Sequence, residues 1–221
     1  MKTSLPSIIV TVIVFGTSNL FGLNETATET QKNEKVDYDG ITKIFKQHDK
    51  KRIYSLKEYT PEKLQNLKRV HLSKSNVTNE ELNKLSQLPN VLLWNLGACK
   101  KLTPECQATL KKMTSARIID MALITVFKDY DEVVDTFKDH KNLQFISLNT
   151  IKDKEPTEKY KAFLKDRPNL QILIGSYKDK AHRIKHKTTI QNIVQKWIDD
   201  GVITFEEAST FAGKRFNKPG K

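Results

Sequence analysis

Two histidines four residues apart are the first residues of this sequence whose types and spacing could do chemistry. His182 and His186 would lie on one side of a helix, a spacing that zinc-binding pairs use. No glutamate follows the first histidine, as a hydrolytic zinc site requires, and the surrounding segment 178–187, KDKAHRIKHK, would repel a cation. We therefore expect a solvated basic segment here and no metal site.

The remaining reactive residues form no recognisable catalytic motif. Cys99 and Cys106 are the only cysteines, and they either pair in an oxidising compartment or serve as small buried apolar residues. The sequence has no glycine-rich phosphate loop, no Gly-x-Ser-x-Gly elbow and no Cys-x-x-Cys pair. We expect no enzymatic activity and no cofactor.

The first 23 residues predict the compartment of the protein. Lys2 precedes an uncharged stretch whose most apolar part is IIVTVIVF, the layout of a secretory signal. The stretch is almost long enough to remain as an N-terminal membrane anchor, for which ~20 apolar residues are needed. Either alternative predicts an exported protein that is periplasmic, bound to the cell surface or secreted. Residues 24–36, NETATETQKNEKV, predict a flexible linker.

A repeat occupies the middle of the chain. Five segments read apolar-x-x-apolar-x-apolar and start at residues 67, 91, 116, 143 and 170, so their separations are 24, 25, 27 and 27 residues. Between them, the segments 78–88, 103–113, 131–140 and 157–167 begin with hydroxyl or acidic residues and carry apolar residues at helical spacing. Strands that alternate with helices predict an α/β fold with a parallel sheet.

Two of these repeats carry the features of a known family. The segments LKRVHLSKSNVTNEEL at 67–82 and VLLWNLGACKKLT at 91–103 resemble leucine-rich repeats, and the second resembles their cysteine-containing subtype. Cys99 and the pair Leu102-Thr103 hold the positions that are typical of this subtype. The resemblance is specific over 64–114 and weaker over 115–175. It implies a leucine-rich-repeat solenoid over 37–177, with a parallel sheet, one layer of helices, and Cys99 buried and reduced.

Helical pieces are expected to cap both ends of this solenoid. An amphipathic helix at 39–48 and a strand at 52–56 precede the repeats. After the repeats, a basic linker at 178–187 leads to a helical hairpin at 188–215. Its segment WIDDGVITFEEA resembles a short C-terminal hairpin of many bacterial proteins, which implies an interaction or oligomerisation element. The alternative is a cap that packs Trp197 onto the last repeat.

The strand residues between the core positions predict where a ligand binds, because strand alternation directs them outward in rows. The first row is Arg69, Leu93, Ile118, Phe145 and Ile172, and the second is His71, Asn95, Asp120, Ser147 and Ile174. A mostly apolar row beside a mostly polar one predicts a contact surface. The candidate ligand-binding residues are Arg69, His71, Leu93, Asn95, Ile118, Asp120, Phe145 and Ser147. The alternative is that the N-terminal linker or the C-terminal hairpin covers the apolar row.

The charge balance adds a second functional hypothesis. The chain has 38 Lys and Arg against 26 Asp and Glu, a net charge of +12. The first hypothesis is an exported scaffold that binds a protein or glycan through its exposed strand face. The second is an envelope-associated structural protein held to anionic polymer or lipid by its charge. A nucleic-acid partner conflicts with the export signal and with the few aromatic residues of the basic segment. Membrane contact is expected only through an uncleaved N-terminal segment.

Overall fold

The computed structural model describes residues 36–48, 59–151, 155–209 and 216–218. The predicted signal segment, nearly all of the linker after it, the predicted strand at 52–56 and the end of the C-terminal hairpin lie outside these residues. Within the described ranges, no helix combines the length and the apolar character needed to cross a bilayer.

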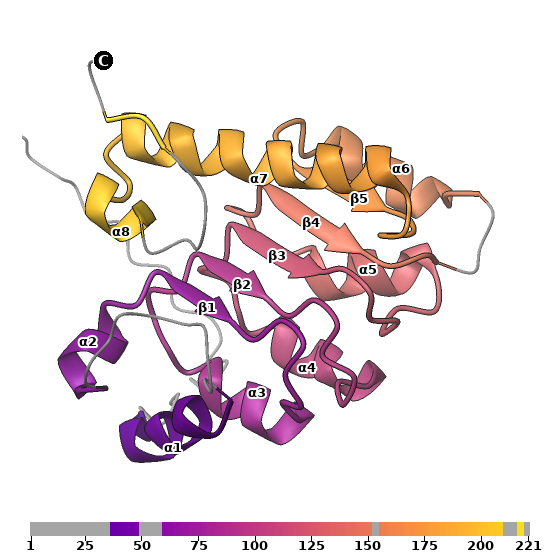
Figure 1. The fold of residues 1–221 in the computed structure, drawn as a ribbon. Coiled ribbons are helices and arrows are strands. Elements are labelled where there is room, and N and C mark those ends of the chain that lie inside the picture. The colour runs from indigo at the N-terminus through magenta and orange to yellow at the C-terminus, as the bar shows by residue number, and fades with distance from the viewer. Residues whose placement is uncertain (1–35, 49–58, 152–154, 210–215, 219–221) are drawn as a thin grey trace, which may run out of the picture. The chain divides into compact units, whose positions relative to one another are not determined.

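Five short strands form one parallel sheet, in which each strand pairs with the next one along the chain (Figure 1). The strands are β1 (Arg69–His71), β2 (Leu93–Asn95), β3 (Ile118–Met121), β4 (Phe145–Leu148) and β5 (Gln171–Ile174). The prediction of an α/β fold with a parallel sheet is therefore confirmed.

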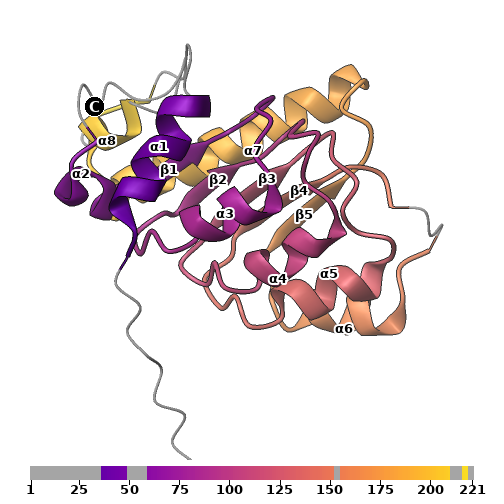
Figure 2. The same ribbon diagram turned by 90° about the horizontal axis from the view of Figure 1, so that it is seen from below.

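Helices contribute to an apolar core on each face of the sheet (Figure 2). The first core receives side chains from α1 (Tyr38–His48), α2 (Pro61–Gln65), α3 (Asn79–Leu85), the 3-10 turn η1 (Pro104–Cys106), α4 (Gln107–Leu110), α5 (Tyr130–Phe137) and α6 (Glu158–Lys165). The second core receives side chains from α7 (Lys180–Asp199) and α8 (Phe205–Ser209).

Side-chain caps start the helices where the sequence has hydroxyl and acidic residues. The Oγ1 atom of Thr78 accepts a hydrogen bond from the N–H of Glu81, and the Glu81 carboxylate accepts one from the N–H of Thr78. Asp129 and Thr157 each accept a hydrogen bond from the N–H three residues ahead, at the starts of α5 and α6. A cap of this kind stabilises a helix by roughly 0.5–2 kcal/mol, so local sequence sets these helix starts.

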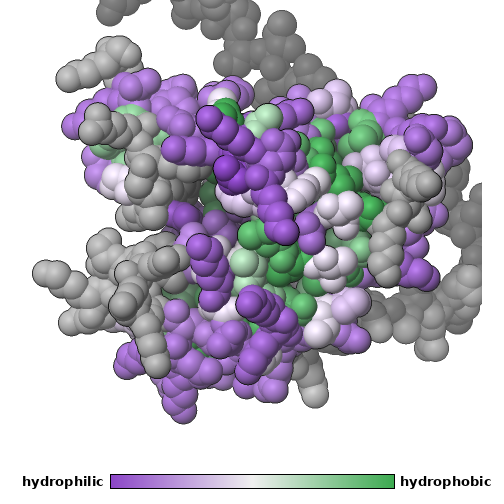
Figure 3. Space-filling view, turned by 45° about the vertical axis from the view of Figure 1, so that its right-hand side comes forward, coloured by the Kyte–Doolittle hydropathy of each residue, from purple (hydrophilic) through white to green (hydrophobic). Residues whose placement is uncertain are grey.

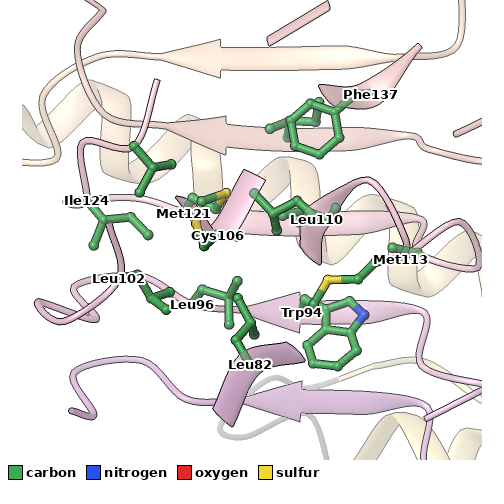
Figure 4. Packing of buried hydrophobic residues seen from close by; sticks show 14 of the residues in the cluster. Leu82, Trp94, Leu96, Leu102, Cys106, Leu110, Met113, Met121, Ile124 and Phe137 are labelled. Atoms are coloured by element: carbon green, nitrogen blue, oxygen red, sulfur yellow. The ribbon is translucent and has the colours of Figure 1, made fainter. Parts of the chain in front are cut away.

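The first core lies between the sheet and the helices α1 to α6 (Figure 4). Val70, Trp94, Ile119 and Ile146 are neighbours in register across four strands, and each is at most 1% exposed. The helices pack apolar side chains onto this row, among them Leu82, Leu110 and Phe137. Each fully buried side chain of this size stabilises the fold by about 1.5–3 kcal/mol.

Both cysteines belong to this core, and neither forms a disulfide. Cys99 and Cys106 are fully buried. The Cys99 thiol donates a hydrogen bond to the carbonyl oxygen of Leu72, 2.9 Å away in the preceding strand–helix unit. Burial raises the pKa of the Cys99 thiol and raises that of Cys106 to about 12. Of the two alternatives that the sequence left open, the structure has the buried apolar one.

The C-terminal helix differs from the sequence-based expectation in its start and in its position. It begins at Lys180 rather than at Thr188, because the carboxylate of Asp179 accepts a hydrogen bond from the N–H of Ala181 and caps the earlier start. Most of the segment 178–187 is therefore helix and not a linker. The helix α7 packs across the second face of the sheet, so helices cover two faces where the sequence predicted a single layer.

The fifth strand pairs one residue out of the expected alignment. Phe145 lies beside Gln171 and not beside Ile172. A shift of one residue turns every side chain of a strand to the opposite face. Ile172 and Ile174 consequently pack against the first core, whereas Leu173 faces the second. The prediction that the two isoleucines point outward is wrong.

Among the described residues, β5 is the last strand of the sheet on one side. Its residues Gln171–Ile174 are exposed or half-buried, whereas β3 and β4 are fully buried. Figure 3 turns this side of the molecule forward and shows hydrophobic surface between hydrophilic side chains. The sheet is therefore well covered at its centre and open at this edge.

Candidate functional site

The apolar row on the second face of the sheet is buried under α7. Leu93, Ile118 and Phe145 are at most 3% exposed and form one cluster with Val194 and Trp197 of the helix. The structure thus has the arrangement in which the C-terminal segment covers the row. These three strand residues contact α7 rather than solvent.

Polar contacts fix α7 along the same row. The indole Nε1 of Trp197 donates a hydrogen bond to Oε1 of Gln144 at 2.8 Å, and the guanidinium of Arg117 lies 5.9 Å from the centre of the Trp197 ring. Gln144 and Arg117 immediately precede β4 and β3. The position of α7 is therefore set by both apolar burial and directional contacts.

Beyond the apolar row, α7 and the carboxyl ends of β1, β2 and β3 enclose a pocket of about 680 Å³. This volume lies within the range of ~300–1,000 Å³ that is typical of ligand sites. Five of the predicted binding residues line the pocket: Arg69, His71, Leu93, Asn95 and Asp120. The other three, Ile118, Phe145 and Ser147, are buried beside it and are not among its lining residues.

Three equivalent turns form the strand side of the pocket. Each turn is closed by a hydrogen bond from an N–H to the carbonyl oxygen three residues before it, in the segments 72–75, 96–99 and 121–124. The third residue of each turn has a positive φ: 64° at Lys74, 59° at Ala98 and 67° at Leu123. Such a φ costs a residue other than glycine roughly 1–2 kcal/mol. All three residues line the pocket, so the backbone strain of the described chain is concentrated there.

The side chains of Asn95 and Asp120 help to close two of these turns. Their Oδ1 atoms accept hydrogen bonds from the N–H groups of Gly97 and Ala122, each at 3.2 Å. A purely structural role therefore accounts for one oxygen of each side chain. The Nδ2 group of Asn95 and the second carboxylate oxygen of Asp120 are left for other contacts.

The contact between Arg69 and His71 defines the tautomer of the histidine. Nη2 of Arg69 lies 3.1 Å from Nδ1 of His71. A guanidinium group donates hydrogen bonds and does not accept them, so Nδ1 is the acceptor and Nε2 carries the proton. His71 is neutral while this contact holds, and the charge of the pair is that of Arg69.

His186 of α7 meets Asp120 of β3 inside the pocket. The Nε2 and Oδ1 atoms are 3.1 Å apart, and the side chains are 7% and 6% exposed. This is an ion-pair distance, but the relative orientation of the two groups does not satisfy a hydrogen bond. The rings of Phe145 and Tyr177 lie 5.7 Å and 5.3 Å from the His186 ring and enclose it further.

Positive charge dominates the pocket. Its lining has five Lys or Arg side chains and one acidic side chain, that of Asp120. The five basic side chains come from both sides: Arg69 and Lys74 from the strands, and Lys180, Arg183 and Lys187 from α7. With low-dielectric walls, such a lining attracts anions.

Two titratable side chains next to this charge are shifted toward their neutral forms. Burial raises the pKa of Tyr177, and the negative charge of Asp120 raises it further. Burial lowers the pKa of His182, and the neighbouring His186 lowers it further. Both of these side chains are therefore mainly uncharged at neutral pH.

The α7 half of the pocket was missed in the sequence analysis, because the helix was expected to begin at Thr188. A signal for the earlier start is present. Arg183, Lys187, Ile190 and Val194 recur every three or four residues, and all four line the pocket. This spacing continues, toward the N-terminus, the helical face that carries Trp197.

Asp120 lies beside His186 of the α7 histidine pair, but these side chains do not belong to a larger metal-binding cluster of the described residues. No group of three His, Cys, Asp or Glu side chains that could hold a metal ion occurs in the described part of the chain.

No family model, no curated protein and no solved structure matches this chain.

Proposed function

We propose that this chain is an exported leucine-rich-repeat binding protein, whose protein or glycan partner presents an acidic group to the pocket between the strands and α7. The single observation that carries the proposal is the lining of that pocket, in which five basic side chains surround one acid. A binding role accounts for this lining, because basic side chains on both sides of a pocket attract an anionic group.

Several contacts support the leucine-rich-repeat part of the proposal, because residues about one repeat apart touch. Thr103 donates its N–H to Oδ1 of Asn79, and Asn149 donates to Oγ1 of Thr125, both across 24 residues. The same four-residue turn closes after β1, β2 and β3. Stacked units that share one interior produce this regularity. In such a solenoid, α1 would cap the β1 end.

A second candidate function is a structural protein of the envelope, held to anionic polymer by charge alone. It is favoured by exposed lysines of the α7 region that do not line the pocket, such as Lys178 and Lys185. Under this alternative any exposed lysine would matter equally. Under the pocket proposal, only the lining residues would.

A matched pair of double variants separates these two functions. We expect the full chain to bind polyglutamate or polygalacturonate, and not dextran, in biolayer interferometry at moderate salt. The pocket variant Lys180→Gln with Lys187→Gln should weaken binding about threefold to tenfold, since each exposed ion pair contributes ~0.2–1 kcal/mol. The control variant Lys178→Gln with Lys185→Gln removes the same charge outside the pocket and should leave binding nearly unchanged.

Equal losses in the two double variants would favour the charge-only alternative. If neither acidic polymer binds at any salt concentration, the proposed function is wrong.

A further inference from the structure

We infer that the pocket binds a short peptide segment of a partner protein, in which a carboxylate lies next to aliphatic side chains. The inference rests on the proposed function, because it concerns the same pocket, and it selects a protein over a glycan. The choice of a peptide follows from the apolar side chains of the lining, which are distinct from the five basic side chains that favour an anion.

The pocket brings together the two large apolar side chains that are exposed among the described residues. Leu123 is 46% exposed and Ile184 is 57% exposed, and both line the pocket. Leu123 belongs to the turn after β3 and Ile184 to α7, so they approach the pocket from its two sides. Exposed apolar side chains that converge on one pocket indicate an apolar ligand group.

Buried apolar side chains continue this surface inward. Leu93 from β2 and Ile190 and Val194 from α7 are at most 7% exposed and line the same pocket. A ligand that covers Leu123 and Ile184 would therefore meet further apolar atoms below them. Removal of such surface from water stabilises a complex by roughly 25 cal/mol per Å² of apolar area.

The charged side chains lie on both sides of this apolar surface. Arg69 and Lys74 belong to the strand side, and Lys180 and Lys187 to α7. One carboxylate would thus meet basic groups from either side while neighbouring alkyl groups contact the apolar residues. Asn95 adds an amide donor for a peptide carbonyl, because its Oδ1 atom already accepts from Gly97.

An acidic glycan fits this lining less well. Its surface is dominated by hydroxyl groups, and burying a hydroxyl on apolar side chains without a partner is unfavourable. A peptide with alternating acidic and aliphatic residues offers both required chemistries at short spacing. The pocket volume of about 680 Å³ suits a short segment rather than a folded surface.

The test compares three blocked tetrapeptides with the full chain by isothermal titration calorimetry. The first alternates leucine and glutamate, the second replaces leucine with serine, and the third replaces glutamate with glutamine. We expect the first peptide to bind about tenfold more tightly than either of the others, because each lacks one of the two required chemistries.

The variant Ile184→Ser should weaken the leucine-containing acidic peptide about fivefold and leave the serine-containing one unchanged. Lys185→Ser, at the next position of α7 and outside the pocket lining, is the matched control and should change neither. Because Ile184 is 57% exposed, its replacement should keep the melting temperature, which shows that the fold is intact.

The outcomes distinguish this inference from the proposed function. If the serine-containing peptide or polygalacturonate binds as tightly as the leucine-containing acidic peptide, the inference fails and the proposed function stands. If no anionic probe binds, both fail. Tightest binding of the leucine–glutamate peptide, with loss in Ile184→Ser only, supports the inference.

Discussion

A buried histidine shows how one side chain can make the stability of this protein depend on pH. His140 is fully buried, and its Nε2 lies 3.0 Å from the carbonyl oxygen of Leu110, which can only accept. Nε2 therefore carries the proton, and Nδ1 has no hydrogen-bond partner. Burial lowers the pKa of His140, and the charge of Arg167 lowers it further. A second proton on Nδ1 would place an uncompensated charge beside the ring of Phe137.

Replacement of this histidine tests the argument. Because the folded pKa is below the unfolded value of about 6.5, the unfolded chain takes up a proton first as pH falls. Stability should therefore fall from pH 7.5 to pH 5.5, by at most about 1.4 kcal/mol for one such group. We expect His140→Gln, which keeps a donor for Leu110, to lose most of this pH dependence in urea unfolding.

The control is His182→Gln, a side chain that is only half-buried and whose pKa is also lowered by burial. It should remove a smaller part of the pH dependence. Glu81 does not interfere. Burial raises its pKa, but the hydrogen bond from the N–H of Thr78 and the His48 ring 3.1 Å away outweigh that effect, so the pKa is lowered and this carboxyl affects stability only at lower pH. An unchanged slope in His140→Gln would contradict the assignment.

At the level of single elements, the turns after β1, β2 and β3 both line the candidate pocket and carry backbone strain. Lys74, Ala98 and Leu123 adopt positive φ at equivalent positions, where glycine would be unstrained. The N–H groups of Lys74 and Ala98 extend the ladder of the sheet by donating to the carbonyl oxygens of Gly97 and Ala122, at 2.8 Å each. The turn geometry is therefore imposed by neighbouring units rather than by the turn residue itself.

Glycine at one of these positions should stabilise the protein. In Ala98→Gly, relief of the positive φ gains roughly 1–2 kcal/mol, and the greater freedom of glycine in the unfolded chain offsets ~0.5–1 kcal/mol of it. We expect a net gain of about 0.5 kcal/mol in the free energy of unfolding, measured by urea denaturation. Ala181→Gly, in the exposed first turn of α7, makes the same chemical change at an ordinary helical φ and should destabilise. Destabilisation by both variants would show that Ala98 is unstrained.

Most helices and strands of this protein were predictable from sequence, but the register of β5 and the start of α7 were not. Helix starts and strand positions followed from local signals, namely hydroxyl or acidic caps and a spacing of 24 to 27 residues. The register of β5 was not predictable, because Gln171–Ile174 has three consecutive apolar residues and either alignment buries some of them. The start of α7 was predicted wrongly because Thr188 and Asp179 are both plausible caps, and the helical spacing of Arg183 and Lys187 that favours Asp179 is formed largely by charged residues.

The candidate site was likewise predictable only in part, on its strand side and not on its α7 side. Its strand half, with Arg69, His71, Asn95 and Asp120, follows from strand alternation, which is a local property. Its α7 half depends on a contact between segments far apart in the sequence, which periodicity alone does not reveal. The apolar row gave a hint of that contact, since a row of this composition requires a cover of some kind.

At the scale of the whole described body, two cores share one sheet. Trp94 lies in the first core and Trp197 in the second, and each is 1% exposed. The strand residues of the two cores alternate, so Leu93 and Ile118 of the second are bonded directly to Trp94 and Ile119 of the first. Loss of either core would expose the strand face that it covers, and the same strands form the floor of the other core. The two cores should therefore unfold together.

The two tryptophans allow each core to be followed separately. Trp94→Phe leaves Trp197 as the fluorescent reporter of the second core, under α7. Trp197→Phe leaves Trp94 as the reporter of the first core, under α1 to α6. In each variant we expect the urea midpoint from fluorescence to coincide with that from far-ultraviolet circular dichroism. Both probes are compared within one variant, so a change in stability caused by the substitution does not affect the comparison.

A fluorescence transition in Trp94→Phe that precedes the dichroism transition would mean that α7 leaves the sheet first. The pocket would then be a separable assembly, formed only while α7 is docked, and ligand binding would stabilise α7 and not the sheet. Coincident midpoints instead make the pocket as stable as the fold, so that an anionic ligand should raise both midpoints equally.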